Sequence, residues 1–128
     1  MVDKTWARSS IYFTRNIGNC LGDVVPDDVA CVLSTVHLAE IGDIVGIWLH
    51  PDASDDARLP ARVRAGDAAL IKILAAQEET AISVMTLNPV WVGPIPRAHI
   101  DAIHKVIGFR EADGRMWMWE RLITKGAA

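Results

Sequence analysis

The fold is decided by the stretch AALIKIL at residues 68–74, the most apolar run in the chain. The turn-forming sequence Ala65-Gly66-Asp67 directly precedes it. A short apolar run bounded by turn formers is typical of a β-strand rather than of a long helix. Similar short runs recur along the chain, so the sequence predicts one mainly β domain over residues 1–128.

Eight short apolar runs are the candidate strands. They cover residues 11–15, 29–33, 44–49, 59–64, 68–74, 81–87, 103–110 and 116–122. The expected turns contain Pro26-Asp27-Asp28, Gly42-Asp43, Pro51-Asp52, Ala65-Gly66-Asp67, Asn88-Pro89, Gly93-Pro94 and Asp113-Gly114. The spacing of residues 97–105 and 116–125 also fits a short helix. The polar stretch 50–58 is expected to be an exposed hairpin or loop insertion.

The composition excludes several function classes. A chain of 128 residues, 51% of them hydrophobic, suffices for one domain with a core. Its net charge is −3 and its basic residues are scattered, which disfavours direct binding to nucleic acid. No stretch has the pattern of a signal peptide or a membrane span, so no membrane association is expected. Two cysteines are too few for a disulfide framework, and a reducing cytoplasm is the expected location.

Lys72 is the first candidate for chemistry, because it lies within the most apolar run. With a period of two it shares a strand face with Leu70 and Leu74. If that face is buried, desolvation favours the neutral amine, which can serve as a general base. The alternative is a lysine on an edge strand with its amine in water.

Cys20 is the candidate nucleophile. It lies in the glycine-flanked turn Gly18-Asn19-Cys20-Leu21-Gly22, where the backbone can hold a side chain exposed. A nearby lysine would activate the thiol, whereas a turn cysteine without one is an inert small residue. Cys31 alternates with Val29 and Leu33 on one strand face, so we expect it to pack in the core.

The other polar residues indicate no metal or cofactor. The histidines are His37, His50, His99 and His104, and their spacing does not place two on one metal. Ser34 has no nucleophile-elbow or phosphate-loop sequence around it, so we interpret it as a turn residue. We therefore expect neither a metal site nor a bound cofactor.

The last apolar element predicts an interface. Trp117 and Trp119 alternate with Met116 and Met118, which makes both faces of this element apolar. Such an element needs a second surface, so these tryptophans predict a site of self-association or of contact with a partner.

Six stretches, taken in order, resemble the LexA/UmuD family, which includes the C-terminal domains of lambda-type phage repressors. They are residues 11–21 (strand and Gly-Asp-Ser-Met turn), 25–32 (apolar, Asp-Gly-Asp, apolar strand entry), 41–45 (Gly-Asp-apolar step), 69–74 (lysine strand), 85–91 (Leu-x-x-Asn-Pro-x-aromatic turn) and 103–109 (closing strand). Each motif is short, and the resemblance lies in their order over about residues 11–110.

The resemblance implies a fold, a pair of site residues and an assembly. The implied fold is a compact twisted sheet or partly open barrel of the LexA C-terminal type. In that family a serine attacks a peptide bond in the protein's own N-terminal region, a buried neutral lysine is the base, and the domain dimerises. The resemblance places Cys20 at the nucleophile position and Lys72 at the base position. The backbone amides of Leu21 and Gly22 are then candidates for stabilising the oxyanion.

The chain also departs from the family pattern. Cysteine replaces serine and is followed by leucine, and the segment between Gly42-Asp43 and Lys72 is long. Only nineteen residues precede Cys20, and they contain neither an Ala-Gly nor a Cys-Gly pair for self-cleavage. From the same shortness we expect no N-terminal DNA-binding domain.

These observations predict a cytoplasmic regulatory domain that acts by dimerisation or protein binding. The resemblance implies an SOS or phage regulatory context, with a regulatory protein or a polymerase as partner. One alternative is an active Cys20/Lys72 peptidase that cleaves a partner in trans. The other is an unrelated β-barrel binding module, in which Cys20 and Lys72 would lie far apart.

Overall fold

The computed structural model describes residues 11–15, 21, 22, 24, 25, 28–56, 59, 69–87 and 90–118, with only the backbone of Ser54, Trp117 and Met118. These residues form eight strands and two short 3-10 helices, without an α-helix. The strands are β1 (Ile11–Arg15), β2 (Ala30–Ser34), β3 (Ile44–Leu49), β4 (Ala69–Gln77), β5 (Ala81–Leu87), β6 (Val90–Pro96), β7 (Ile100–Arg110) and β8 (Met116–Met118). The 3-10 helices are η2 (Pro51–Asp55) and η3 (Arg97–His99). The prediction of a mainly β fold is confirmed.

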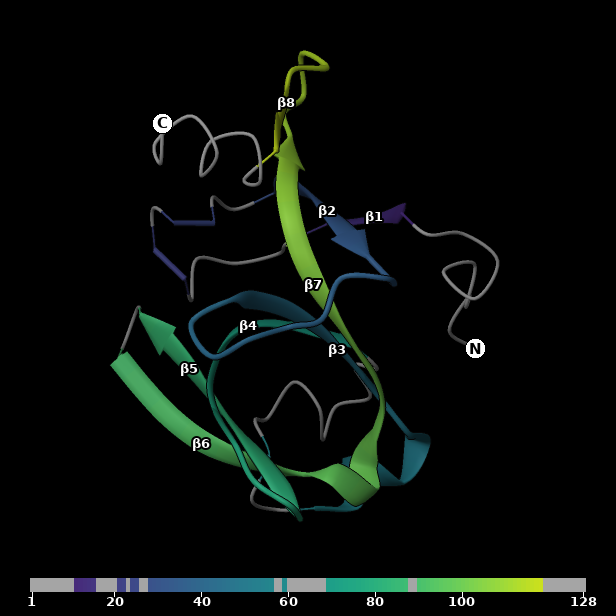
Figure 1. The fold of residues 1–128 in the computed structure, drawn as a ribbon, viewed down its shortest axis with the longest axis vertical. Coiled ribbons are helices and arrows are strands. Elements are labelled where there is room, and N and C mark those ends of the chain that lie inside the picture. Colours follow the sequence, from purple (N-terminus) through teal and green to yellow (C-terminus); the bar gives the residue numbers. More distant parts are fainter. Residues whose placement is uncertain are drawn as a thin grey trace.

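All eight strands belong to one antiparallel sheet. Its order is β1-β2-β7-β3-β4-β5-β6, and β8 pairs with the end of β7. The long strand β7 connects two regions: β1, β2 and β8 lie around its C-terminal end, and β3 to β6 curl around its other end (Figure 1). In the described part of the chain no pairing joins β1 to β6, so these two strands are the edges of an open, twisted sheet.

The sheet buries apolar side chains on both of its faces. The β3–β6 core consists of Val45, Ile47, Leu49, Ala53, Leu59, Leu70, Leu74, Ile82, Val84 and Ile95. The β1–β2 core consists of Tyr12, Leu21, Val25, Val29, Cys31, Leu33, Ile44 and Val106. Along β4, Leu70 and Leu74 point into the first core, whereas Ile71 and Ile73 pack against the second. A strand that is covered on both faces needs apolar residues at consecutive positions, which explains why residues 69–74 are apolar at every position except Lys72.

The predicted turn at Gly93-Pro94 is wrong, because both residues lie inside β6. Proline cannot donate a hydrogen bond to a neighbouring strand, and it is therefore confined to edge strands or strand ends. Among the described strands, β6 pairs with β5 alone, which allows Pro94 and Pro96 to lie opposite Ser83 and Ala81.

Other predictions need smaller corrections. Strands β1, β3 and β5 match the predicted ranges, and β7 begins three residues earlier than predicted, after η3. Residues 97–105 are therefore mostly strand rather than helix. Within the stretch 50–58, predicted as an exposed hairpin or loop insertion, Pro51–Asp55 form the 3-10 helix η2 rather than a hairpin, and Ala53 is buried in the β3–β6 core. Most of the predicted strand at 59–64, and the turns at 26–27, 65–67 and 88–89, lie outside the described residues.

The described segments contain no helix that is long and apolar enough to cross a bilayer.

Candidate functional site

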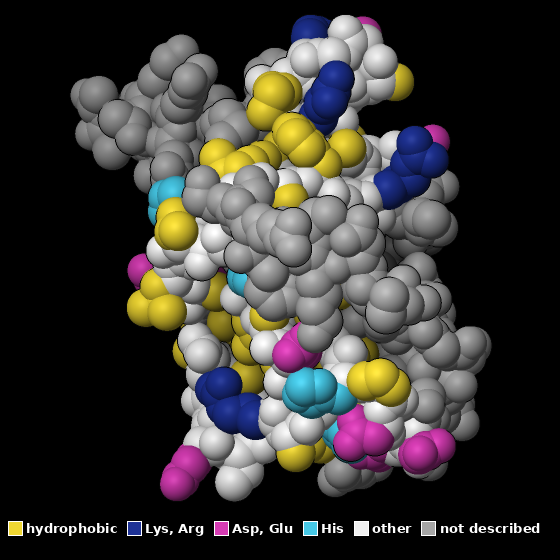
Figure 2. Space-filling view, turned by 90° about the vertical axis from the view of Figure 1, so that its right-hand side faces the viewer, with side chains coloured by type: hydrophobic (Ala, Val, Ile, Leu, Met, Phe, Trp, Pro, Cys, Tyr) yellow, Lys and Arg dark blue, Asp and Glu magenta, His cyan; other side chains and the backbone are white. Residues whose placement is uncertain are grey.

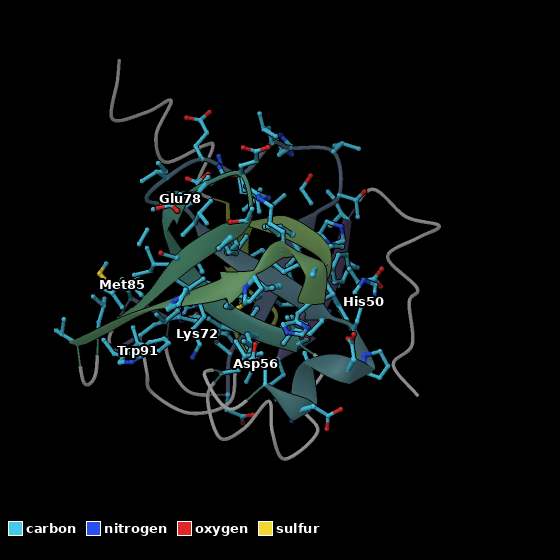
Figure 3. All side chains as sticks on the ribbon, turned by 90° about the horizontal axis from the view of Figure 1, so that it is seen from below. His50, Asp56, Lys72, Glu78, Met85 and Trp91 are labelled. Carbon is cyan, nitrogen blue, oxygen red and sulfur yellow. The ribbon has the colours of Figure 1, made fainter. Side chains whose placement is uncertain are left out.

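Lys72 lies on the inner face of an interior strand. Strand β4 is flanked by β3 and β5, so the alternative of an edge-strand lysine is wrong. The side chain shares its face with Leu70 and Leu74, and only 6% of the residue is exposed. In the view from below, Lys72 lies between Trp91 of β6 and Asp56, which follows η2 (Figure 3). Of the two placements that the sequence leaves open for this lysine, the structure shows the buried one.

The strand register gives Lys72 a defined set of neighbours. Val45 of β3 lies directly opposite it. On the other side, Ile73 pairs with Met85, so the next residue of β5, Thr86, lies beside Lys72 on the inner face. Thr86 in turn pairs with Trp91 at the edge of the sheet. The resulting row brings an amine, a hydroxyl and an indole onto one apolar surface, and Lys72 and Thr86 are both buried in it.

Cys20 lies outside the described residues, so the distance between its sulfur and the Lys72 amine stays a prediction. The two residues that follow it are described. Gly22 has a left-handed backbone with φ of +58°, as a turn at this position requires. Leu21 is fully buried in the β1–β2 core, on the face of the sheet opposite to Lys72. A dyad therefore requires Cys20 to point away from the direction that Leu21 takes.

Sequence reasoning missed a buried polar network in the β1–β2 core. Trp48 Nε1 donates a hydrogen bond to Tyr12 Oη at 2.7 Å, and Tyr12 Oη lies 2.6 Å from His104 Nδ1. Burial raises the pKa of Tyr12 to about 12, against a smaller lowering by the Trp48 hydrogen bond, and burial lowers the pKa of His104. The signal available in the sequence was His104 itself, which lies between the apolar residues Ile103 and Val106 of β7.

A second unpredicted cluster joins the two 3-10 helices. His99 Nε2 lies 3.1 Å from Asp56 Oδ2, and His99 Nδ1 lies 3.8 Å from Asp52 Oδ1. Figure 2 shows histidine and acidic side chains together in the lower half of one face of the molecule. The backbone N–H of His50 also donates to the His99 carbonyl at 2.8 Å. Within the described residues, no three His, Cys, Asp or Glu side chains are placed to hold a metal ion. We therefore interpret this cluster as a structural contact that holds the two 3-10 helices together.

Ser34 and Cys31 have structural roles, as expected. The Ser34 hydroxyl accepts the backbone N–H groups of Val36 and His37 and lies 2.6 Å from His37 Nδ1. It therefore organises the turn that leaves β2. Cys31 is fully buried, and burial raises its thiol pKa to about 12, which keeps it protonated and unreactive.

Of the two predicted interface tryptophans, the structure describes only the backbone of one. Trp117 lies in β8 opposite Phe109, but its side chain and all of Trp119 are outside the description. The structure exposes other apolar side chains instead. They are Ile11 and Phe13 on β1, Val24 before β2, Val36, Leu38 and Ile41 in the loop after β2, Val90, Trp91 and Val92 on β6, and Met116 on β8.

Comparison with protein-family models, curated proteins and solved structures finds no match for this chain. Its function is therefore inferred from the residues themselves. Two features differ from an ordinary β domain: the buried row that contains Lys72, and the exposed apolar start of β6.

Proposed function

We propose that this chain is a LexA/UmuD-like regulatory domain of the cytoplasm that acts by pairing with a second copy of itself through β6. The observation that carries the proposal is the exposure of Val90 and Val92, at 75% and 56%, on the outermost strand of the sheet. The kinship is supported by the order of the resembling stretches, of which residues 11–15, 69–74 and 103–109 lie in strands. The resemblance to this family also implies an SOS or phage regulatory context, with a regulatory protein or a polymerase as a further class of partner.

The outer edge of β6 is open only at its start. In an antiparallel strand, alternate residues direct their N–H and C=O groups to opposite sides. Prolines in an edge strand occupy positions at which the missing N–H would face away from the sheet. Val90 and Val92 lie an even number of positions before Pro94 and Pro96, so their backbone groups face the same side as those of the prolines. The valine N–H groups therefore face outward, whereas the prolines offer none. Within β6, a second strand can therefore pair with residues 90–92 but not with the N–H positions of Pro94 and Pro96.

The composition of this edge favours self-pairing. Exposed edge strands usually carry charges that prevent association, yet residues 81–96 contain no Asp, Glu, Lys or Arg. An antiparallel pair of two β6 strands centred on Trp91 places Val90 opposite Val92 of the second copy. The arrangement is two-fold symmetric, as a closed dimer requires, and it covers the exposed valines of both copies.

The experiment is sedimentation equilibrium of the whole chain with lysine placed on the edge. We expect a dimer at tens of micromolar, and we expect Val90→Lys/Val92→Lys to weaken dimerisation by about 100-fold, because four ammonium groups would meet at the interface. Val36→Lys is the matched control, since Val36 is 71% exposed in the loop after β2. A strictly monomeric parent chain, or equal weakening by the control, would contradict the proposal.

A second candidate function is a cysteine peptidase that cleaves a partner chain, and the burial of Lys72 on an interior strand favours it. In that reaction the Lys72 amine takes the thiol proton, and the Cys20 thiolate attacks the carbonyl carbon of a peptide bond. The amides of Leu21 and Gly22 hold the oxyanion, and the amine returns the proton to the departing nitrogen; water then hydrolyses the thioester. We rank this function second because Leu21 packs on the opposite face of the sheet.

Alkylation of Cys20 tests the dyad. In a Cys31→Ala background, we expect iodoacetamide to react at neutral pH about tenfold faster with the parent chain than with Lys72→Met, because a base that takes the proton raises the thiolate fraction. Unfolding curves of the two proteins control for loss of structure. A sluggish thiol with the same pH profile in both proteins would leave no dyad.

A further inference from the structure

Met85 lies on the outer face of the sheet, one strand inside the edge that β6 forms. The strand register places it between Ile73 of β4 and Val92 of β6. Its neighbours in the chain, Val84 and Thr86, are buried on the inner face, whereas Met85 is half-buried. Figure 3 shows the Met85 side chain at the border of the molecule, turned away from the ribbon. The thioether therefore shares its face with the exposed side chain of Val92.

The pair formed by Met85 and Val92 is of the kind that brings side chains closest together. The Arg97 N–H donates to the Thr80 carbonyl at 2.9 Å, and the register between β5 and β6 runs without a shift. Odd-numbered residues of β6 therefore direct their N–H and C=O groups to β5, whereas Val92 directs its groups away from β5. Pairs of this second kind are not hydrogen-bonded, and their Cα atoms are about 4.5 Å apart. The thioether of Met85 is thus placed against the Val92 side chain.

In the β6 dimer, the apolar row that contains Met85 continues into the second copy. Pairing centred on Trp91 places Val92 opposite Val90 of the second copy, and Val90 pairs with Leu87 of its own chain. The two-fold axis generates an equivalent row beside it. The strand of the second copy lies two strand spacings, about 10 Å, from Met85. It therefore does not cover the sulfur, which stays within reach of small oxidants.

We propose that Met85 is a site at which hydrogen peroxide or an organic hydroperoxide oxidises the chain and thereby weakens its self-pairing. This inference rests on the proposed β6 dimer. The sulfur lone pair forms a bond to the terminal peroxide oxygen as the O–O bond breaks, and the hydrogen of that oxygen leaves with the other oxygen as water or an alcohol. The thioether is oxidised by two electrons to a sulfoxide, and the peroxide is reduced by the same two electrons.

Sulfoxide formation makes one position of the apolar row polar. Methionine sulfoxide is polar and chiral, whereas the thioether is apolar and polarizable. The sulfoxide oxygen accepts hydrogen bonds from water, and a polar group that loses this water on burial opposes association. Because Met85 is placed against Val92, its hydrated sulfoxide opposes the burial of Val92 against the second copy. One sulfoxide in each chain gives two such positions in the dimer.

The test is sedimentation equilibrium of the whole chain before and after treatment with hydrogen peroxide, while mass spectrometry measures the sulfoxide at each of the four methionines. Both samples are returned to a thiol reductant, so that no disulfide contributes to association. We expect full oxidation of Met85 to raise the dissociation constant of the dimer by about tenfold. Met85→Leu keeps the row apolar and cannot be oxidised, so its dissociation constant should not change with peroxide.

Met116→Leu is the matched control for oxidation elsewhere in the chain. Met116 is 49% exposed on β8, which pairs with β7 rather than with β6. This variant should therefore respond to peroxide as the parent chain does. Met85→Gln places an amide where the sulfoxide would form, and it should weaken dimerisation by a similar factor without peroxide. Urea unfolding curves show whether each protein is folded under the conditions of the test.

The outcomes separate the oxidation site from the dimer on which it rests. A parent chain that is monomeric before oxidation contradicts the β6 dimer, and the oxidation site with it. Three results overturn the oxidation site alone: a dissociation constant that is unchanged once Met85 is a sulfoxide, a weakening that persists in Met85→Leu, and a treatment that oxidises Met116 but leaves Met85 intact. Unfolding of the chain on oxidation of Met85 also contradicts it, because the loss of pairing would then follow from the loss of the fold.

Discussion

Replacing Leu74 by alanine is expected to lower the free energy of unfolding by about 3–5 kcal/mol, the upper part of the range for a buried leucine. Leu74 is fully buried in the β3–β6 core and lies opposite Val84. Its backbone is fixed on both sides of the residue, because its N–H donates to Asp43 O and its C=O accepts from Gly42 N, each at 2.8 Å. The strand therefore cannot move inward to fill the cavity, and the full cost is retained.

Urea unfolding followed by tryptophan fluorescence measures this loss. Leu38→Ala is the matched control, since Leu38 is 85% exposed and should change the free energy of unfolding by no more than about 0.5 kcal/mol. A loss below about 1 kcal/mol for Leu74→Ala would mean that this face of β4 is not the buried one. The inward placement of Lys72, which shares the face, would then be wrong as well.

Local signals in the sequence were sufficient for most of the strands. The ranges 11–15, 44–49 and 81–87 coincide with β1, β3 and β5 because each is a short apolar run between turn formers. Strand β6 was missed because Gly93 and Pro94 are strong local turn signals. Whether a proline is tolerated in a strand depends on whether that strand lies at an edge, and this depends on the order of strands in the sheet.

The candidate site shows the same division between local and long-range information. The face of Lys72 follows from a period of two within β4, and the structure agrees. The Tyr12–His104 contact joins residues 92 positions apart, and the Tyr12–Trp48 contact joins residues 36 positions apart. Both depend on the insertion of β7 between β2 and β3, which no short stretch of the sequence specifies.

Gly46→Ala is the second substitution with a large expected effect, a loss of about 1–3 kcal/mol from overpacking. A Cβ atom at this position would lie 2.3 Å from Leu33 Cδ2 and 3.6 Å from Ile71 Cδ1. Leu33 is fully buried in the β1–β2 core, so it has no free space into which to turn. A glycine within a buried strand marks such a close approach between neighbours.

Gly93→Ala is the matched control, because its added Cβ atom would meet a side chain that can move, whereas the Cβ atom of Gly46→Ala would meet one that cannot. Its Cβ would lie 2.1 Å from the Trp91 ring, an overlap as severe as the one at Gly46. Trp91 is 37% exposed at the sheet edge and can swing toward solvent, so we expect a loss below about 1 kcal/mol. Equal losses in the free energy of unfolding for Gly46→Ala and Gly93→Ala would mean that the loss does not depend on whether the neighbouring side chain can move.

Leu33→Ala supplies the final step of the test, because it removes the atom that Gly46→Ala would meet. The two single substitutions act on one contact, so the double variant should be less destabilised than the sum of the single variants by about 1 kcal/mol or more. Urea unfolding of the four proteins gives this coupling. Additive losses would show that Leu33 does not confine Gly46, and the close packing of β2 on β3 across the β1–β2 core would have to be abandoned.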